Sequence, residues 1–211
     1  PAEALKAQAI AARTYAITTA KSADFDHYAD TRSQVYKGVG IETPSTNAAV
    51  DATRGQVVTY EGRPVVTYFF STSGGRTESV ENTPLGNEPR PWLKSVEDEY
   101  DDVSPRHRWT KRMSMKSAQR RLGSLVKGTF RGIKVTRRGD SPRIVAAEVI
   151  GSRGRTPTDG ATLRARLDLY DTWARFTAIR SKAVRARSSA TPRPYVLAAR
   201  RPVAQLRGSV I

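Results

Sequence analysis

The sequence predicts an α+β fold, in which an alanine-rich N-terminal helix packs on a mostly antiparallel sheet built from hairpins. Three observations support this prediction. Residues 2–21 are dense in alanine, the best helix former. Apolar and polar residues alternate over several short runs that turn residues separate. Helix and strand patterns are also interspersed along the chain, and a basic C-terminal tail follows the last of them.

The first predicted helix covers residues 2–21 and places Leu5, Ala9, Ala12 and Ala16 on one face. Small side chains on this face allow a neighbouring element to approach closely. A helix of this composition is typically buried and structural.

The remaining elements follow from alternation, capping residues and turn residues. A loop over 22–47 contains Ser33–Tyr36, which fits a short strand. The later predictions are a helix over Thr46–Thr53 capped by Thr46, a hairpin of Gln56–Tyr60 and Val65–Phe70, a helix over Lys116–Leu125, strands over Phe130–Arg137 and Ile144–Ile150, a helix over Thr162–Leu169 capped by Asp159 or Thr162, and a strand over Trp173–Ile179.

Residues 1–179 are predicted to form one domain. The segment 180–211 contains eight Lys or Arg residues and no acid, and it is predicted to be a basic linker or tail, or the start of another module. Because Pro1 already lies at the edge of a helical pattern, we expect a processed or truncated product whose signal sequence lies upstream.

The charge is strongly positive, with 36 Lys plus Arg against 20 Asp plus Glu and a net charge of +16. Twelve basic residues and no acid lie in 106–138, whereas 81–102 contains seven acids. This pattern fits either a solvated surface or attraction to a polyanion. No apolar run approaches the roughly 20 residues that span a bilayer. The absence of cysteine excludes a disulfide scaffold, a Cys-ligated zinc site and a thiol nucleophile.

Few residues are obvious catalytic candidates. His27 and His107 have no partner at metal-ligand spacing, so both are interpreted as solvated or structural. The loop Ser71–Glu78 offers hydroxyls and glycines that suit ligand binding, although the local sequence alone favours a tight turn with a capping Glu. Glu3 could act as a general acid if it were buried, but Lys6 on the same face favours an ion pair.

Several motifs together resemble the SpoIID/LytB family, in the family's order over about residues 1–179. The most specific are PAEALKAQAIAARTYA at 1–16 and FFSTSGGRTE at 69–78. Supporting motifs are QVYKG at 34–38, AAVDATRGQVVTY at 48–60, PWLKSV at 91–96, Ser104-Pro105, Trp109, Gly151 and Leu163-Arg164.

The resemblance implies an extracytoplasmic protein of the cell wall that acts on peptidoglycan. Sporulation members are lytic transglycosylases that cleave peptide-free glycan strands to 1,6-anhydro ends, whereas other members are non-catalytic amidase enhancers or wall-binding modules. The implied partners are glycan strands, and in addition anionic wall polymers or a wall amidase. No cofactor and no nucleic-acid partner are expected; nucleic-acid binding, suggested by the charge, is the weaker alternative because no nucleic-acid module is found.

Two departures from the family pattern matter. The family's catalytic Glu belongs to a Glu-Met-Pro segment that would precede Pro1, so Glu3 is expected to support the site rather than to carry the reaction. Some members bind zinc through a Cys and a His before the Gln-x-Tyr motif, and residues 28–33 contain neither. We therefore expect no metal site.

The resemblance, taken residue by residue, defines a candidate glycan-binding set. Glu3 is the candidate catalytic or supporting acid. The candidate substrate-binding residues are Lys6, Gln8, Arg13, Tyr15, Gln34, Tyr36, Ser71, Thr72, Ser73, Gly74, Thr77 and Glu78.

Overall fold

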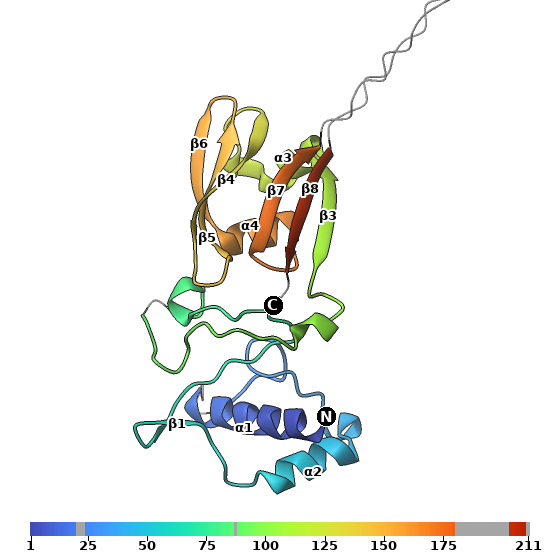
Figure 1. The fold of residues 1–211 in the computed structure, drawn as a ribbon, viewed down its shortest axis with the longest axis vertical. Helices are drawn as coiled ribbons and strands as arrows, with labels where there is room; N and C mark the ends of the chain where they lie inside the picture. Colours follow the sequence, from blue (N-terminus) through green and yellow to red (C-terminus); the bar gives the residue numbers. More distant parts are fainter. Residues whose placement is uncertain (20–23, 87, 180–202, 210–211) are drawn as a thin grey trace, which may run out of the picture. The chain divides into compact units, whose positions relative to one another are not determined.

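A computed structural model describes residues 1–19, 24–86, 88–179 and 203–209. The chain divides into two compact units, unit 1 over Pro1–Phe70 and unit 2 from Ser71 onward. Both helices and antiparallel sheets are present, which confirms the predicted α+β class and its N-terminal helix (Figure 1). The prediction of a single domain over 1–179 stays a prediction.

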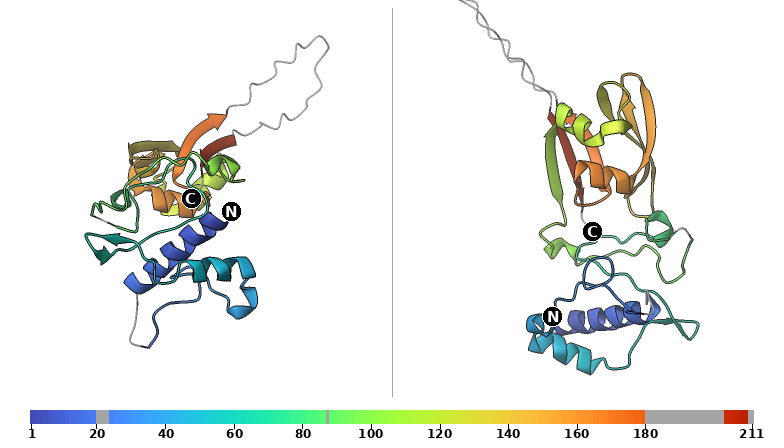
Figure 2. Two further views of the ribbon diagram at one scale, coloured as in Figure 1. Left: turned by 60° about the horizontal axis from the view of Figure 1, so that its bottom comes forward. Right: turned by 180° about the vertical axis from the view of Figure 1, so that it is seen from behind.

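Unit 1 consists of two helices and a small hairpin. Helix α1 covers Ala2–Thr18 and packs against α2, Pro44–Ala52, as both views of Figure 2 show. Helix α2 begins two residues earlier than predicted, because Thr43 rather than Thr46 is its N-cap and Pro44 occupies its first turn. In α1, Thr14 is the buried residue, so the expectation of a largely buried helix was wrong.

The hairpin of unit 1 is much shorter than predicted. Its strands are β1, Thr59–Tyr60, and β2, Arg63–Pro64. Glu61 and Gly62 connect them with φ values of 49° and 76°, as a type I′ turn requires. Beyond β2 the chain bonds to α1 instead of to a strand, since the Thr67 hydroxyl donates to the carbonyl of Ala11. Residues 33–36 form no strand.

Unit 2 contains two three-stranded antiparallel sheets. One is formed by β4 (Phe130–Arg138), β5 (Ile144–Gly151) and β6 (Gly154–Asp159) in that order. The other has the order β3-β8-β7, with β3 at Trp109–Ser114, β8 at Val203–Ser209 and β7 at Trp173–Ile179. Strand β8 is the described part of the basic tail; residues 180–202 and 210–211 lie outside the described residues.

Two helices complete unit 2. Helix α3 covers Met115–Leu122, and α4 covers Gly160–Leu167 with the Asp159 side chain as its N-cap. A 3₁₀ turn, Gly123–Leu125, takes the place of the predicted end of α3. Leu122, Val149 and Leu163 are fully buried and belong to the hydrophobic core that both helices and both sheets share.

Candidate functional site

Arg13 binds the C-terminal end of α2 in unit 1. One terminal nitrogen donates to the carbonyl oxygens of Thr53 and Gln56 at 2.8 and 2.9 Å, and the other donates to the carbonyl of Val50 at 3.2 Å. The last carbonyls of a helix have no partner within it, so a guanidinium here satisfies acceptors that would otherwise need water. The structure therefore gives this candidate binding residue a helix-capping role.

Two more candidate residues of unit 1, Gln34 and Tyr36, form side-chain hydrogen bonds within the unit. Gln34 donates its amide to the carbonyl of Ala12 at 3.1 Å. The Tyr36 hydroxyl donates to Glu42 at 2.8 Å, and this bond raises the pKa of the tyrosine above its ordinary value. The ring of Tyr36 is 50% exposed, so it remains available to a ligand.

Tyr15 is the centre of an aromatic cluster in unit 1. Its ring lies 6.2 Å from that of Tyr68 and 6.1 Å, edge-on, from that of Phe69. His27 lies 6.4 Å from the same ring, and its Nε2 bonds the carbonyl of Ala16. Phe69 is still 39% exposed. The cluster thus holds the partly exposed ring of Phe69 against the ring of Tyr15.

The first turns of α1 are exposed. The Glu3 side chain is 82% exposed and forms an ion pair with Lys6 at 2.7 Å. Gln8 is also exposed. The burial on which a general-acid role for Glu3 would depend is absent, and the ion pair that the sequence favoured is present.

The loop Ser71–Glu78 in unit 2 is built around Asp101. This carboxylate is almost fully buried, and it accepts hydrogen bonds from the backbone amides of Ser73 and Gly74 at 2.6 and 2.9 Å. His107 bonds the same carboxylate through Nδ1 at 2.6 Å. Gly74 and Gly75 adopt φ values of 74° and 100°, which favour glycine, so the backbone can present its amides to the acid.

The loop hydroxyls are held by neighbouring side chains of unit 2. The Thr72 and Ser104 hydroxyls lie 2.7 Å apart, and the Ser73 hydroxyl donates to Asp98 at 2.8 Å. Thr72 and Ser73 are buried, whereas Ser71 is exposed and Thr77 is half-buried. Sequence reasoning named His107 only as a solvated or structural histidine, and it gave no role to Asp98 and Asp101 of the acidic stretch 81–102.

A buried ion pair, Arg143 with Asp171, also holds the loop Ser71–Glu78. Arg143 donates through its terminal nitrogens to the carbonyls of Ser73 and Arg76 at 2.7 and 2.8 Å. Its Nε lies 3.2 Å from Asp171, and these side chains are 4% and 0% exposed. Burial raises the pKa of Asp171, while the guanidinium acts in the opposite direction. The sequence analysis gave no signal for this pair, because the two residues lie 28 positions apart in the chain.

Glu78 fastens the loop to the β4–β5 turn. One carboxylate oxygen accepts from the Ser141 hydroxyl at 2.6 Å, and the other accepts from the amides of Asp140 and Ser79 at 2.9 and 3.0 Å. A Cβ at Gly139 would lie 2.2 Å from this carboxylate, so a larger residue there would displace it from its present position. The carboxylate of this candidate residue is therefore occupied by the protein itself.

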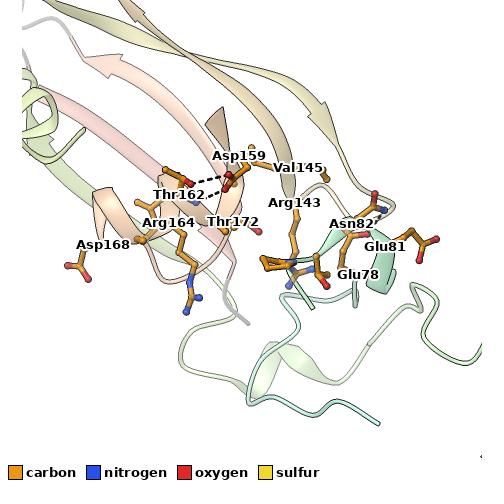
Figure 3. A pocket seen from close by; sticks show the side chains of 17 residues that line it. Glu78, Glu81, Asn82, Arg143, Val145, Asp159, Thr162, Arg164, Asp168 and Thr172 are labelled. Atoms are coloured by element: carbon orange, nitrogen blue, oxygen red, sulfur yellow. Dashed lines mark hydrogen bonds between the residues drawn. The ribbon is translucent and has the colours of Figure 1, made fainter. Parts of the chain in front are cut away.

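Glu78 also lines a pocket of about 660 Å³ in unit 2. Figure 3 shows Glu78, Asn82 and Arg143 at one end of it and Arg164 and Asp168 at the other. Much of its wall is apolar, from residues that include Pro84, Ile144, Val145, Ala161, Ala165 and Leu169. The pocket is thus large enough for a small organic group, with charges at its ends.

Stability of unit 2 is expected to fall with acid through Asp101. Burial alone would raise its pKa, but the bonds from His107, Ser73 and Gly74 outweigh burial and lower the pKa below the ordinary 3.8. The carboxylate therefore stabilises the fold fully above about pH 4, and this contribution is lost as the pH falls through its lowered pKa. Urea unfolding at a series of pH values should show this loss.

The matched variant for this test is Asp101→Asn. Its amide cannot accept from both backbone donors and His107, so we expect about 1–3 kcal/mol of lost stability at neutral pH. The variant should also lose less stability between pH 4 and pH 2 than the natural chain does. Equal acid sensitivity of the two proteins would show that other groups control this range.

The described residues contain no group of three or more His, Cys, Asp or Glu side chains placed to hold a metal ion. Within the same residues, no helix has the length and apolarity needed to cross a membrane.

The chain is similar to known sporulation proteins. Residues 1–60 match the SpoIID family, described as "Stage II sporulation protein". The chain is 35% identical over 189 residues to "Stage II sporulation protein D" of Bacillus subtilis (strain 168), covering 79% of this chain and 52% of that protein. The protein of the same name from Bacillus amyloliquefaciens is 33% identical over 187 residues, with 79% and 52% coverage.

Another relative carries a different description. The "Amidase enhancer" of Bacillus subtilis (strain 168) is 34% identical over 125 residues, covering 59% of this chain and 16% of that protein. The chain spans about half the length of the Stage II sporulation protein D relatives that it matches.

Proposed function

The chain belongs to the SpoIID/LytB family, and from this membership we propose that it binds peptide-free glycan strands of peptidoglycan outside the cytoplasm, in cell-wall remodelling during sporulation. The observation that carries the proposal is the surface exposure of aromatic rings within the family's motifs. Tyr36 and Phe69 are 50% and 39% exposed, and Tyr15 supports Phe69 from behind. Exposed, rigidly held rings suit stacking on the apolar faces of sugars.

The proposed reaction is lytic transglycosylation, which needs one acid and no nucleophilic carboxylate. The acid protonates the glycosidic oxygen as the bond to C1 breaks. The 6-hydroxyl of the same sugar bonds to C1 and gives its proton to the carboxylate that the acid has become, so a 1,6-anhydro ring forms without water. We assign the acid to the Glu of the family's Glu-Met-Pro segment, and Glu3 with its partner Lys6 is assigned a supporting role.

The candidate residues divide between contact and support in this proposal. Tyr36, Gln8, Lys6, Ser71 and Thr77 contact the glycan. The remaining members are assigned to hold the backbone and rings in place: Arg13, Tyr15, Gln34, Thr72, Ser73, Gly74 and Glu78.

The second candidate function is enhancement of a wall amidase, which the similarity to the "Amidase enhancer" favours. Peptide-free strands are incubated with the full-length protein that the gene encodes, and the products are identified by mass spectrometry. This experiment distinguishes transglycosylation from amidase enhancement. Release of 1,6-anhydro ends supports transglycosylation. Folded protein that releases none, yet increases the rate at which an amidase cleaves peptidoglycan, would overturn transglycosylation in favour of the enhancer.

Glycan binding itself is testable on this chain with Tyr36→Ala. Loss of one stacked ring is expected to weaken binding to peptide-free strands about fivefold, from the roughly 1 kcal/mol that an aromatic contact contributes. Tyr100→Ala is the control, since Tyr100 is 82% exposed and lies outside the candidate set. Equal affinity of both variants in a pull-down titration would exclude Tyr36 from the binding surface.

A further inference from the structure

The ring of His107 in unit 2 is held through one nitrogen and leaves the other open. Its Nδ1 lies 2.6 Å from the carboxylate of Asp101, which is ionised at neutral pH and can therefore only accept hydrogen bonds. Nδ1 must then carry the proton, which makes Nε2 a hydrogen-bond acceptor. Nε2 has no partner among the described residues, yet it is not one of the buried polar atoms, so it is accessible to solvent.

A glycine lies against the same edge of this ring. A Cβ at Gly75 would lie 3.6 Å from Cε1 of His107, the ring carbon next to Nε2. A larger residue would place further side-chain atoms near this edge, and the φ of 100° at Gly75 disfavours one. The loop Ser71–Glu78 therefore approaches His107 with backbone alone, and the His107 side chain keeps 21% of its surface exposed.

Gly75 also lines an open hollow of about 460 Å³ in unit 2. The other described residues that line it are Arg76, Glu97, Glu99, Asp140, Pro142 and Trp173. The ring of Trp173 is half-buried, and the buried guanidinium of Arg143 lies 5.4 Å from its centre and holds it from the interior. An aromatic ring can stack on the apolar face of a sugar, while neighbouring carboxylates accept hydrogen bonds from its hydroxyls.

The charge of the hollow favours an uncharged ligand. Three carboxylates line it, and the cation Arg76 is already paired with Glu97 at 2.7 Å. Over the described ranges, Glu99 and Asp140 form no ion pair. An anionic group would be repelled here, whereas hydroxyl and amide N–H groups would find acceptors. Glycan strands alternate N-acetylglucosamine, which is uncharged, with N-acetylmuramic acid, which carries a carboxyl on its lactyl group, so the hollow favours the first of the two.

We propose that this hollow of unit 2 binds an N-acetylglucosamine unit of the strand, and that Nε2 of His107 accepts a hydrogen bond from the adjoining part of the strand. Trp173 lies against the sugar ring, and Asp140 accepts from its hydroxyls. The inference rests on the proposed function and adds to it a sugar subsite whose residues lie outside the candidate set. Because Asp101 fixes the tautomer of His107, the acceptor is already oriented before the glycan binds.

The first test observes His107 directly, since the chain has only two histidines. The natural chain is labelled with ¹⁵N-histidine and examined by NMR at mildly alkaline pH, alone and with a tetramer of N-acetylglucosamine. We expect His107 to carry its proton on Nδ1, and the signal of its Nε2 to move as the tetramer is added. The Nε2 signal of His27 should change much less, because this nitrogen is already bonded to the carbonyl of Ala16.

The second test compares variants of the hollow with a charge-matched control. Trp173→Ala and Asp140→Asn should each bind the tetramer about fivefold more weakly than the natural chain, through loss of one stacked ring or one charged acceptor. Glu88→Gln removes an exposed acid of unit 2 outside the hollow and should bind as the natural chain does. Circular dichroism checks folding; if Trp173→Ala does not fold, the exposed Asp140 and the NMR signal decide.

Several results would overturn the inference. A His107 signal that stays in place at high tetramer concentration, or a proton on Nε2 instead of Nδ1, would exclude the proposed contact. Equal losses in Asp140→Asn and Glu88→Gln would indicate a general effect of charge. If peptide-free strands bound the natural chain while the tetramer left His107 unchanged, only this inference would fail. If the natural chain did not bind the strands at all, the proposed function itself would fail.

Discussion

Replacing Arg143 with leucine is expected to lower the free energy of unfolding of unit 2 by about 3–5 kcal/mol. The substitution leaves Asp171, whose side chain is 0% exposed, as an uncompensated charge in the interior. It also removes the two hydrogen bonds that the Arg143 guanidinium donates to the carbonyls of Ser73 and Arg76. The loop Ser71–Glu78 therefore loses part of its support. Urea unfolding followed by tryptophan fluorescence measures the change, since Trp109 and Trp173 belong to unit 2.

Two further variants isolate the reason for this effect. Arg131→Leu removes an exposed cation from β4 and should change stability by less than about 0.5 kcal/mol. The double variant Arg143→Leu/Asp171→Leu removes both charges and should be less destabilised than the sum of the single variants. Additive single effects would contradict the ion-pair explanation.

Replacing Glu78 with alanine is expected to cost about 2–4 kcal/mol, because hydrogen bonds to a charged group are each worth about 1.5–3 kcal/mol. The Ser141 hydroxyl and the amides of Asp140 and Ser79 would lose their common acceptor. The β4–β5 turn would then separate from the loop Ser71–Glu78. Thermal unfolding, together with hydrogen exchange at Asp140 and Ser141, measures this loss.

Glu99→Ala is the matched control, since Glu99 is exposed and lies in the same acidic stretch as Glu97. It should leave the melting temperature nearly unchanged. If Glu78→Ala were equally stable and only glycan binding fell, Glu78 would be a ligand contact instead of a structural acceptor, as the family resemblance alone implies.

The strands that sequence reasoning missed have a physical explanation. Strand β6 is polar and contains Pro157, which argues against a strand, but β6 is an edge strand in which a missing N–H is tolerated. Strand β3 also lies at an edge, and its exposed residues, Thr110 and Arg112, are polar. Strands β4 and β5 and helix α4 were predicted closely, because their alternation and the Asp159 cap are local signals.

At the candidate site, too, local sequence patterns were readable and contacts between distant residues were not. The motifs of the sequence assigned the candidate residues mainly to two segments, the helix at the N-terminus and the loop Ser71–Glu78, and their role in glycan binding stays a prediction. The partners of these segments were invisible: Asp101 and Arg143 lie 27 to 70 residues along the chain from the atoms they bind. Spacing along the sequence carries no information about such contacts.

By itself, the sequence determined the α+β class, the family, most helices and strands, and a positive charge divided between the middle and the tail. Tertiary structure decided which charges are buried, which are paired and which remain exposed. It made Arg13 a helix cap and Glu78 an anchor, and it placed Arg166 of α4 at the end of α3. The reason is physical: helix propensity and alternation are local properties of the chain, whereas burial and ion pairing depend on residues that only folding brings together.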